Sequence, residues 1–403
     1  MTNWGINVMA KKRGNNEGTI SKRKDGRWCA VLTTGYDENN KQKRQFFYGK
    51  IRQSVADKLN KTINDITNGL YVEPNKVTVA EWLKVWLMEY KKPSVRSTTY
   101  ESYEYLNRVH IKPSIGHFYL KDLRPEHLQK LYNDKVYKEG SDKKSRISAR
   151  TVKNMHNVIH AALDQAVLNN LVIKNVSNST VLPKCTKKQI RVLTIDEQKA
   201  FVCILDDEKH KLAFLIALGT GLRLGEVSAL KWQDFNFYEN TIKICRTVRR
   251  TKIFIDGRMT KSQLIYQTPK TDAGNRTIPI PASIVTSIKE YKKNQNLHIL
   301  SSGPLYQNND LMFCNEYGVQ LDPSSLSKMF SRLIKKANLD HINFHGLRHT
   351  FATRLLEVNE HPKVVQEILG HSDISLTLNT YTHVMPEIKK SAIQKIEHLL
   401  VKS

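Results

Sequence analysis

Residues 343–357, NFHGLRHTFATRLLE, place two histidines and an arginine close together in a stretch with helical periodicity. Residues three and four positions apart share one face of a helix, so His345, Arg348 and His349 are expected to project together. An adjacent apolar stripe consists of Leu347, Phe351, Leu355 and Val358. The stretch is therefore predicted to be a helix that is half core and half functional site.

This cluster has three interpretations: a metal site, structural histidines of a buried helix, or a phosphate site. The two histidines have the spacing of H-E-x-x-H zinc sites, but Gly346 stands where the glutamate general base would be. A single histidine beside a buried helix is commonly structural, because histidine is intermediate in burial. Arg348 favours phosphate, because a guanidinium donates two parallel hydrogen bonds to phosphate oxygens.

Charge and length limit the class of protein. The 403 residues include 64 Lys and Arg against 38 Asp and Glu, which gives a formal net charge of +26 spread along the chain. Such an excess favours a polyanionic partner. A chain of this length is expected to fold into two or three domains.

Membrane insertion, secretion and disulfide stabilisation are not indicated. The longest apolar run, LAFLIALGTGL at 212–222, is too short to span a bilayer, and the first residues lack the apolar core of a signal peptide. The five cysteines are scattered and never spaced C-x-x-C, which argues against a disulfide framework or a zinc knuckle. A reduced, cytosolic protein without a membrane partner is expected.

The N-terminal residues predict a small module of three strands and a helix, residues 10–72. Residues 14–50 hold three strand-like runs separated by an Asp25-Gly26 turn and a D-E-N-N-K turn, and a helix-like stretch ended by Gly69 follows. A basic sheet can bind a DNA groove, although a solvated basic surface is the common alternative. The candidate DNA-binding residues are Lys22, Arg23, Lys24, Arg27, Lys43 and Arg44.

Residues 76–175 predict an all-α domain. About four amphipathic segments, each opened by Ser, Thr or Pro, fill this region: TVAEWLKVWLMEY, STTYESYEYLNRVHIKP, RPEHLQKLYNDKV and SARTVKNMHNVIHAALDQAVLNN. Such a basic module suits either a transcription-factor domain or one half of a DNA clamp. The polar, proline-bearing residues 176–190 are expected to form a linker.

Residues 191–403 predict a mainly α domain with a small antiparallel sheet, so the whole chain is expected to have a mixed α+β, multidomain fold. Thr194 and Glu197 form a capping box at the start of one helix, and two buried helical runs meet at a G-T-G hinge. Strand-like runs stand at 241–250, 252–255, 263–267 and 276–280. Helices are expected to resume at Ser325 and to continue to the end.

Three further stretches of this domain carry residues suited to chemistry. In GTGLRLGEVSAL, Arg223 begins a helix, and its structural alternative is a salt bridge to Glu226. In TPKTDAGNRTIPI, Lys270 precedes a turn that joins two strands, where a solvated lysine is the alternative. In LGHSDISLTLNTYTHV, His371 is followed ten residues later by Tyr381, for which a surface tyrosine is the alternative.

Taken together and in this order, TGLRLGE, the predicted hairpin PKTDAGNR, HGLRHTFAT, LGHSD and YTHV resemble the tyrosine recombinase (phage integrase) family. The four-helix segment resembles the core-binding domain of that family, and the N-terminal strands resemble the arm-binding domain of phage and conjugative-transposon integrases. The resemblance implies a site-specific recombinase that integrates and excises a mobile element or prophage. It also implies a bacterial cytoplasmic protein, nucleoid-associated when bound, that forms a homotetramer on double-stranded DNA attachment sites with excisionase or DNA-bending accessory proteins.

The resemblance assigns a catalytic set, which consists of Arg223, Lys270, His345, Arg348, His371 and Tyr381. Breaking a phosphodiester requires a nucleophile, neutralisation of the charge added to a pentacovalent phosphorane, and a proton for the leaving oxygen. Arg223 and Arg348 would hold the non-bridging oxygens. Glu226 would hold Arg223 in place, and His349 would give structural support. Neither a metal nor another cofactor is expected.

Tyr381 would be the nucleophile, although a tyrosine hydroxyl is a poor one at its usual pKa of about 10. His345 would accept its proton, Lys270 would protonate the departing 5′ oxygen from a hairpin tip beside the DNA, and His371 would hydrogen-bond the phosphate. The product would be a 3′-phosphotyrosyl link and a free 5′ hydroxyl. Because the link stores the bond energy, rejoining would need no ATP.

The C-terminal residues 386–403 predict a helix with an apolar stripe of Ile388, Ala392, Ile393, Ile396, Leu399 and Leu400. By resemblance, this helix is expected to dock on a neighbouring subunit of a DNA-bound tetramer. Two other functions are weighed against recombination. A type IB topoisomerase would use the same groups as a monomer, and a DNA-binding regulator would have kept the fold without the chemistry.

Overall fold

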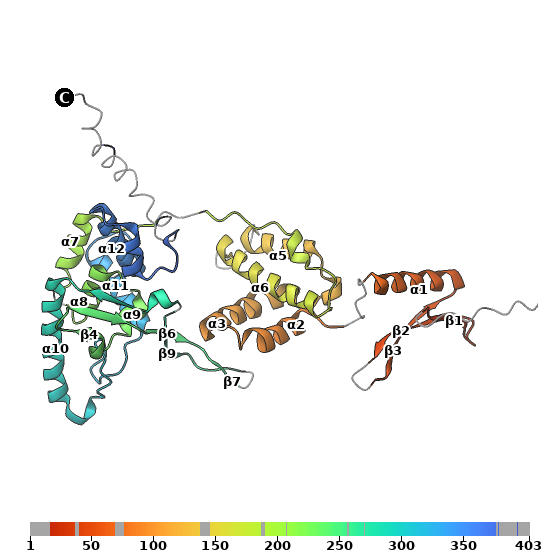
Figure 1. Ribbon diagram of the computed structural model, residues 1–403, viewed down its shortest axis with the longest axis horizontal. Helices are drawn as coiled ribbons and strands as arrows, with labels where there is room; N and C mark the ends of the chain where they lie inside the picture. The colour runs from red at the N-terminus through yellow and green to blue at the C-terminus, as the bar shows by residue number, and fades with distance from the viewer. Residues whose placement is uncertain are drawn as a thin grey trace, which may run out of the picture. The chain divides into compact units, whose positions relative to one another are not determined.

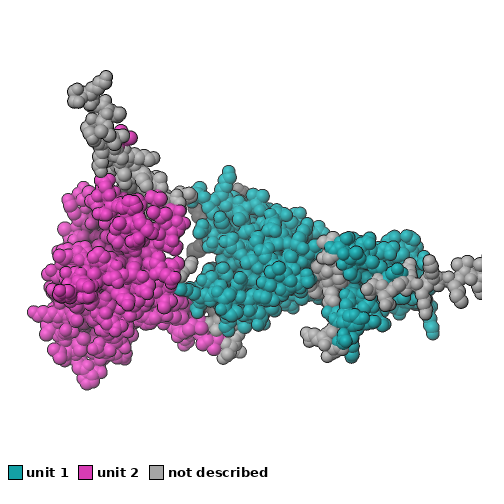
Figure 2. Space-filling view, viewed as in Figure 1, with its two compact units in different colours: residues 1–186 teal, residues 187–403 magenta. Residues whose placement is uncertain are grey.

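The computed structural model describes residues 17–36, 40–68, 76–137, 146–186, 190–206, 208–255, 258–269, 271–375, 378 and 393. The chain divides into two compact units, residues 1–186 and 187–403, which Figure 2 colours separately. Lys270, Tyr381 and all but one residue of the predicted C-terminal helix lie outside the described residues. None of the helices within the described ranges has the length and hydrophobicity that crossing a membrane requires.

Unit 1 begins with a three-stranded antiparallel sheet in the order β1-β2-β3 (Figure 1). The elements are β1 Thr19–Lys22, β2 Trp28–Tyr36, β3 Gln42–Gly49 and α1 Arg52–Thr67. The helix packs on the sheet through a small core of Ala30, Leu32, Val55 and Leu59. Gly26 adopts a left-handed φ of +81° in the turn between β1 and β2, which confirms the predicted turn. Gly69, the predicted helix end, lies outside the described residues.

The described residues 76–179 of unit 1 form mainly helices, as predicted. These elements are α2 Val79–Val85, η1 Trp86–Lys91, α3 Ser97–Leu106, η2 Asn107–Ile111, α4 Lys112–Ile115, η3 Leu120–Asp122, α5 Pro125–Tyr137, α6 Ala149–Leu168 and η5 Val176–Ser179. Thr78 and Ser148 accept hydrogen bonds from backbone N–H groups at the starts of α2 and α6, which explains why these helices begin there. The first two predicted helices each continue into a π-helical stretch, η1 and η2.

The segment predicted to be a linker, 176–190, is not uniform. Its first residues form the 3₁₀ turn η5, in which Ser177 is buried and hydrogen-bonded to Asn175. The division between the two compact units falls between residues 186 and 187, inside the same segment. The domain boundaries themselves stay a prediction.

Unit 2 contains seven α-helices within its described residues: α7 Ile195–Cys203, α8 Lys211–Thr220, α9 Leu224–Ser228, α10 Ala282–Ser302, α11 Pro323–Lys336, α12 His345–Glu357 and α13 Pro362–Leu369. The sequence of α8, KLAFLIALGT, is apolar on nearly every side, and this helix is central, with α10 and α12 packed against it. Four aromatic rings meet in the core: Phe201, Phe214, Phe330 and Phe344. The capping box of Thr194 and Glu197 is confirmed at the start of α7.

The longest helix among the described residues of unit 2, α10, was not expected. Helices were predicted to resume at Ser325, but α10 already spans Ala282–Ser302. Its buried residues, Ile284, Val285 and Ile288, all lie in the first two turns. The remaining turns are largely polar and exposed, so they carry no apolar period that would mark a helix in the sequence.

The strands described in unit 2 form three small sheets. Strands β4 Phe235–Asn236, β5 Thr241–Ile244 and β10 Arg276–Pro279 pair in the order β10-β5-β4, while β6 Thr247–Thr251 pairs with β9 Gln263–Gln267, and β7 Phe254–Ile255 pairs with β8 Arg258–Met259. The stretch PKTDAGNR therefore does not form the predicted hairpin, because it connects β9 of one sheet to β10 of another. A reason is Pro269, which has no N–H with which to extend the β6–β9 ladder. The hairpin of this region is β6–β9, which projects from the body of the unit (Figure 1).

Candidate active site

Arg348 is the most enclosed charged side chain of the predicted catalytic set. It lies in the first turn of α12, and only 1% of its surface is exposed. Its guanidinium donates to the carbonyl of Gly221 over 2.9 Å and to the carbonyl of Leu369 over 2.8 Å. Both carbonyls end helices, α8 and α13, where the helix dipole leaves partial negative charge that stabilises the cation.

Arg223 precedes α9 and is held from three sides. Its Nη1 lies 2.7 Å from Oε1 of Glu226, and its backbone N–H donates to Oε2 over 3.0 Å. Its Nη2 donates to the carbonyl of Gly370 over 3.4 Å. The salt bridge considered as the alternative therefore exists, and so does the contact expected to hold Arg223. The side chain keeps 39% of its surface exposed, so the guanidinium is accessible to a ligand.

The histidines of the predicted site lie next to these arginines. His345 is the first residue of α12, and its ring centroid is 4.6 Å from that of His349, in an edge-to-face arrangement. His371 follows Gly370, whose left-handed φ of +65° ends α13. Partial desolvation and the positive charges of Arg348 and Arg223 lower the pKa of His345 to about 4.

Desolvation and the same two arginines also lower the pKa of His371 to about 4. Both imidazoles are therefore neutral at pH 7, in the form that can accept a proton or a hydrogen bond. Because a bound phosphate would bring negative charge, it would offset part of both shifts.

The structure thus brings together Arg223, His345, Arg348 and His371, the four predicted catalytic residues that it describes. Figure 1 labels α12, which carries His345 and Arg348, and α9, which Arg223 precedes. The apolar stripe predicted beside them is shorter than expected: Leu347 is buried, but α12 ends at Glu357 and Val358 is 69% exposed.

Sequence reasoning missed one residue of this site, Arg276. It is the first residue of β10, and its side chain is 8% exposed. It donates to Oε2 of Glu226 over 3.1 Å and to the carbonyl of Ile368 over 2.6 Å. Burial alone would raise the pKa of Glu226, but the charges and hydrogen bonds of Arg276 and Arg223 outweigh it, and the pKa lies below its ordinary value. No local pattern in GNRTIPI marks the arginine as part of a site.

The six candidate DNA-binding residues of unit 1 are all exposed. Arg23 and Arg27 both lie near the carboxylate of Asp25, at 3.7 and 2.8 Å, and Arg23 also stacks over the ring of Tyr48. Their exposure is what phosphate contacts require and is equally compatible with a solvated surface. Their role stays a prediction.

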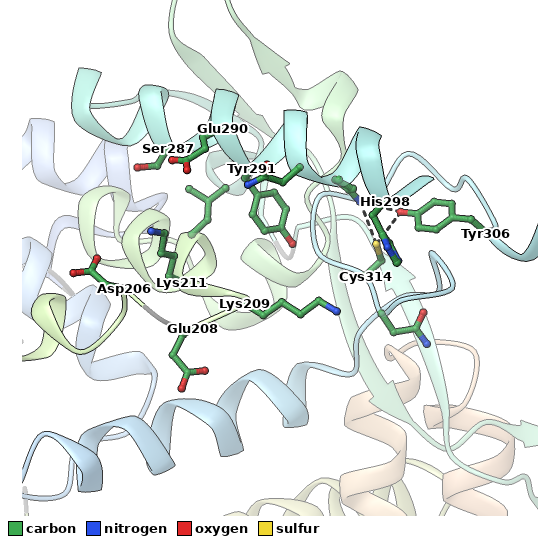
Figure 3. Close-up of a pocket in the computed structure, with 14 residues that line it drawn as sticks. Asp206, Glu208, Lys209, Lys211, Ser287, Glu290, Tyr291, His298, Tyr306 and Cys314 are labelled. Carbon is green, nitrogen blue, oxygen red and sulfur yellow. Dashed lines mark hydrogen bonds between the residues drawn. The ribbon is translucent and has the colours of Figure 1, made fainter. Parts of the chain in front are cut away.

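A pocket of about 450 Å³ lies elsewhere in unit 2, beside α10 (Figure 3). In it, Cys314 contacts the hydroxyl of Tyr306 and the amide of Gln295 at 3.1 and 3.2 Å. Burial and the contact with Cys314 raise the pKa of Tyr306 to about 12. None of the described catalytic candidates lines this pocket, so its chemistry is separate from that of the arginine site.

Comparison with known proteins identifies the family. The model of the phage integrase family matches residues 191–387, and that of the phage integrase N-terminal SAM-like domain matches residues 78–136. A tyrosine recombinase XerC-like protein of Caldanaerobacter subterraneus subsp. tengcongensis is 33% identical over 381 residues, which cover 92% of this chain and 96% of the relative. The transposase from transposon Tn916 of Enterococcus faecalis is 25% identical over 428 residues, which cover 98% of this chain and 100% of the relative.

Solved structures share the fold. The Tn1549 transposon integrase in complex with transposon right end DNA aligns with a TM-score of 0.65 at 24% identity, covering 80% of this chain and 100% of that one. A lambda integrase tetramer bound to a Holliday junction aligns with a TM-score of 0.53 at 18% identity, covering 91% and 98%.

The chain belongs to the phage integrase family of tyrosine recombinases and is an enzyme of site-specific DNA recombination. Within that family it resembles the integrases of conjugative transposons.

Proposed function

We propose that this recombinase cuts and rejoins DNA at the attachment sites of a mobile element through a 3′-phosphotyrosyl intermediate on Tyr381. The observation that carries the proposal is the convergence of a buried arginine, Arg348, and a half-exposed one, Arg223, with neutral His345 and His371. Fixed positive charge beside neutral imidazoles suits a phosphate that gains charge in the transition state and a nucleophile that must lose a proton.

The chemical step balances without a cofactor. The phenolic oxygen of Tyr381 attacks phosphorus, and the bond from phosphorus to the 5′ oxygen breaks. The phenolic proton passes to His345, and Lys270 supplies a proton to the departing oxygen. Rejoining reverses these transfers, with a 5′ hydroxyl as the attacking group, so the phosphodiester count is conserved.

The role of Arg348 follows from its surroundings. Carbonyl oxygens at two helix ends hold its guanidinium, so the charge is in place before DNA binds and need not reorganise during the reaction. Arg223, which is more exposed, would complete the pair by contacting the second non-bridging oxygen. His371 would donate a hydrogen bond to the same phosphate.

The proposed assembly is a homotetramer on double-stranded DNA, in which residues 386–403 of each subunit dock on a neighbour and excisionase or DNA-bending proteins act as accessory partners. The lambda integrase structure, a tetramer bound to a Holliday junction, supports the stoichiometry. Deleting residues 386–403 should spare cleavage of a single site and reduce pairing of two sites on native gels. Unchanged pairing would refute trans docking.

A nicked suicide substrate tests the cleavage proposal. On such DNA the short fragment that carries the free 5′ hydroxyl diffuses away after cleavage, so rejoining cannot occur. A covalent protein–DNA adduct should therefore accumulate, and it should do so in the presence of a metal chelator. Peptide mapping should locate the adduct at Tyr381 and at a 3′ phosphate. Tyr381→Phe should bind the same DNA and form no adduct. An adduct on another residue, or one that requires divalent ions, would overturn the proposal.

A further inference from the structure

The C-terminal end of α13 is held by arginines from three different elements. Three successive carbonyl oxygens each accept a guanidinium hydrogen bond: Ile368 from Arg276 (2.6 Å), Leu369 from Arg348 (2.8 Å) and Gly370 from Arg223 (3.4 Å). The last carbonyls of a helix lack partners within the helix and carry partial negative charge, so they are natural acceptors for cations. His371 is the next residue, so these contacts hold the chain immediately before it.

Like Arg348, and in contrast to the half-exposed Arg223, Arg276 has a buried side chain. Its side chain is 8% exposed, against 39% for Arg223. Each of its guanidinium nitrogens has a protein acceptor: Nε has Ile368, Nη1 has the carbonyl of Gly274 at 3.1 Å, and Nη2 has Glu226. Because its side chain is buried and all three of its guanidinium nitrogens contact protein acceptors, Arg276 is suited to act through neighbouring residues.

Glu226 is the residue through which Arg276 reaches the site. The residue is 4% exposed, and its carboxylate lies between the two arginines: Oε1 is 2.7 Å from Nη1 of Arg223, and Oε2 is 3.1 Å from Nη2 of Arg276. A buried carboxylate with two partners has little freedom to move. The position of Arg223 is thereby coupled to that of Arg276.

The backbone at Gly370, directly after α13, lies close to the guanidinium of Arg276. A Cβ atom added to Gly370 would lie 2.9 Å from Nη1 of Arg276 and 2.6 Å from the carbonyl oxygen of Ala273. The glycine thus leaves the space that the arginine and the segment before β10 occupy.

We propose that Arg276 is a positioning residue for DNA cleavage, which holds the guanidinium of Arg223 through Glu226 and holds His371 through the carbonyl of Ile368. The inference rests on the proposed function, because it concerns the placement of two residues of that site. It predicts that a defect at Arg276 appears in the rate of cleavage rather than in DNA affinity. A purely structural role would instead lower stability and affinity together.

Arg276→Lys is the informative variant, because lysine keeps the charge but cannot donate to Glu226 and Ile368 at once with the geometry of the guanidinium fork. Arg276→Gln removes the charge as well. Arg332→Gln is a matched control: Arg332 is an arginine of the same unit that pairs with Glu208 at 2.9 Å, but its side chain is 65% exposed and it contacts neither Glu226 nor the end of α13 in the hydrogen bonds described above. All variants are made in the full-length protein.

Single-turnover cleavage of the suicide substrate, DNA affinity and melting temperature are measured for each variant. Arg276→Lys should cleave on the order of 10- to 100-fold more slowly, since displacement of a catalytic group by about 1 Å costs up to that much. Its DNA affinity should stay within about twofold of the unchanged protein, and Arg332→Gln should keep the full rate at a similar melting temperature. A rate loss accounted for entirely by unfolded protein would overturn the proposal.

A double-mutant cycle tests the coupling to Arg223. If Arg276 acts through Arg223, adding Arg276→Lys to Arg223→Lys should slow cleavage much less than it does in the unchanged protein. Losses that simply multiply would show that the two arginines act independently and would refute the coupling. The unchanged protein distinguishes the two hypotheses: if it forms no adduct at Tyr381, the proposed function fails, whereas an adduct together with a full rate for Arg276→Lys removes only the positioning role.

Discussion

At the scale of single residues, Arg348 combines burial with contacts to two helix ends. Its two terminal nitrogens reach carbonyls of Gly221 and Leu369, which belong to segments far apart in the sequence. A lysine carries one compact ammonium group and cannot span both carbonyls while facing a phosphate. The planar guanidinium is therefore needed for placement as well as for charge.

The first prediction concerns this placement. Arg348→Lys should slow single-turnover cleavage by about 100-fold or more, the usual effect of losing a preorganised electrostatic contact. Affinity for DNA should change little, because the chain has 64 lysines and arginines that can contribute to phosphate binding. Gel quantification of the adduct and fluorescence anisotropy measure the two effects. A lysine variant that cleaves at the original rate would show that the two carbonyl contacts are unimportant.

The second prediction concerns pH and His345. A proton acceptor must be unprotonated, and a pKa lowered to about 4 keeps His345 neutral from neutral pH down to mildly acidic pH. The cleavage rate should therefore hold as pH falls from 7 to 6 and should decline as pH approaches the lowered pKa. The bound phosphate shifts this decline to somewhat higher pH.

His345→Ala should lower the rate by about 10²- to 10⁴-fold, the range typical of a lost general base. It should also remove the acidic decline from the pH profile of single-turnover cleavage. An alanine variant that keeps both the rate and the decline would assign proton transfer to another group.

At the scale of elements, the C-terminal end of α13 positions the residue that follows it, His371. Gly370 has a left-handed φ of +65°, and the close approach of the Ala273 carbonyl leaves no room for a side chain. Gly370→Ala should destabilise unit 2 by about 1 to 2 kcal/mol through the left-handed backbone alone, with a further cost from the contact. It should also slow cleavage, because the residue after it moves.

Thr194→Ala is the matched control for this third prediction. It removes the capping box of α7, which should cost about 1 kcal/mol. Because α7 contributes none of the described catalytic residues, cleavage by the folded protein should not change. Thermal melting and single-turnover cleavage are measured on both variants. Equal effects of the two substitutions on the cleavage rate would show that only general stability matters.

The helices and strands also show which features can be predicted from local sequence patterns. The caps of α2, α6 and α7 were predicted because each depends on residues within one turn of the helix start. The partner of β9 was not, because strand pairing joins residues distant in sequence. The helix α10 was missed because its fully buried residues all lie in its first two turns.

At the scale of the whole molecule, the net charge of +26 predicts that the affinity for DNA depends strongly on salt concentration. Each phosphate contact releases counterions, so the logarithm of affinity should fall linearly with the logarithm of salt concentration, with a slope of about −0.9 per contact. The fourth prediction is that replacing Lys43 and Arg44 with glutamine, both exposed on β3, makes this slope shallower by about two on DNA that carries the arm-type site.

Fluorescence anisotropy between about 50 and 200 mM salt measures that slope. The cleavage rate on a saturated core-site substrate should stay constant, because unit 1 contains none of the catalytic candidates. Replacing Lys209, an exposed lysine that is paired with Glu316 in unit 2, serves as the control and should leave the slope unchanged. An unaltered slope for the Lys43 and Arg44 variant would show that β3 does not contact DNA.

The sequence by itself determined the class of protein and most of the candidate catalytic residues. Residue type and order carry the chemistry: an arginine at a helix start, a histidine–arginine pair on one helix face, and a histidine followed by a tyrosine. These signals are local or depend only on order along the chain, so they can be read without knowing how the chain folds.

Only the tertiary structure decided which groups hold that set in place. Glu226 was expected to contact Arg223, three residues before it, but its second partner, Arg276, is 50 residues away in sequence. The end of α13 receives hydrogen bonds from Arg223, the residue before α9, and from α12 and β10 only because long-range packing brings these segments to one point. The spacing of residues along the sequence shows which side chains share one face of a helix or strand. Which other element packs against that face depends on the fold of the whole unit.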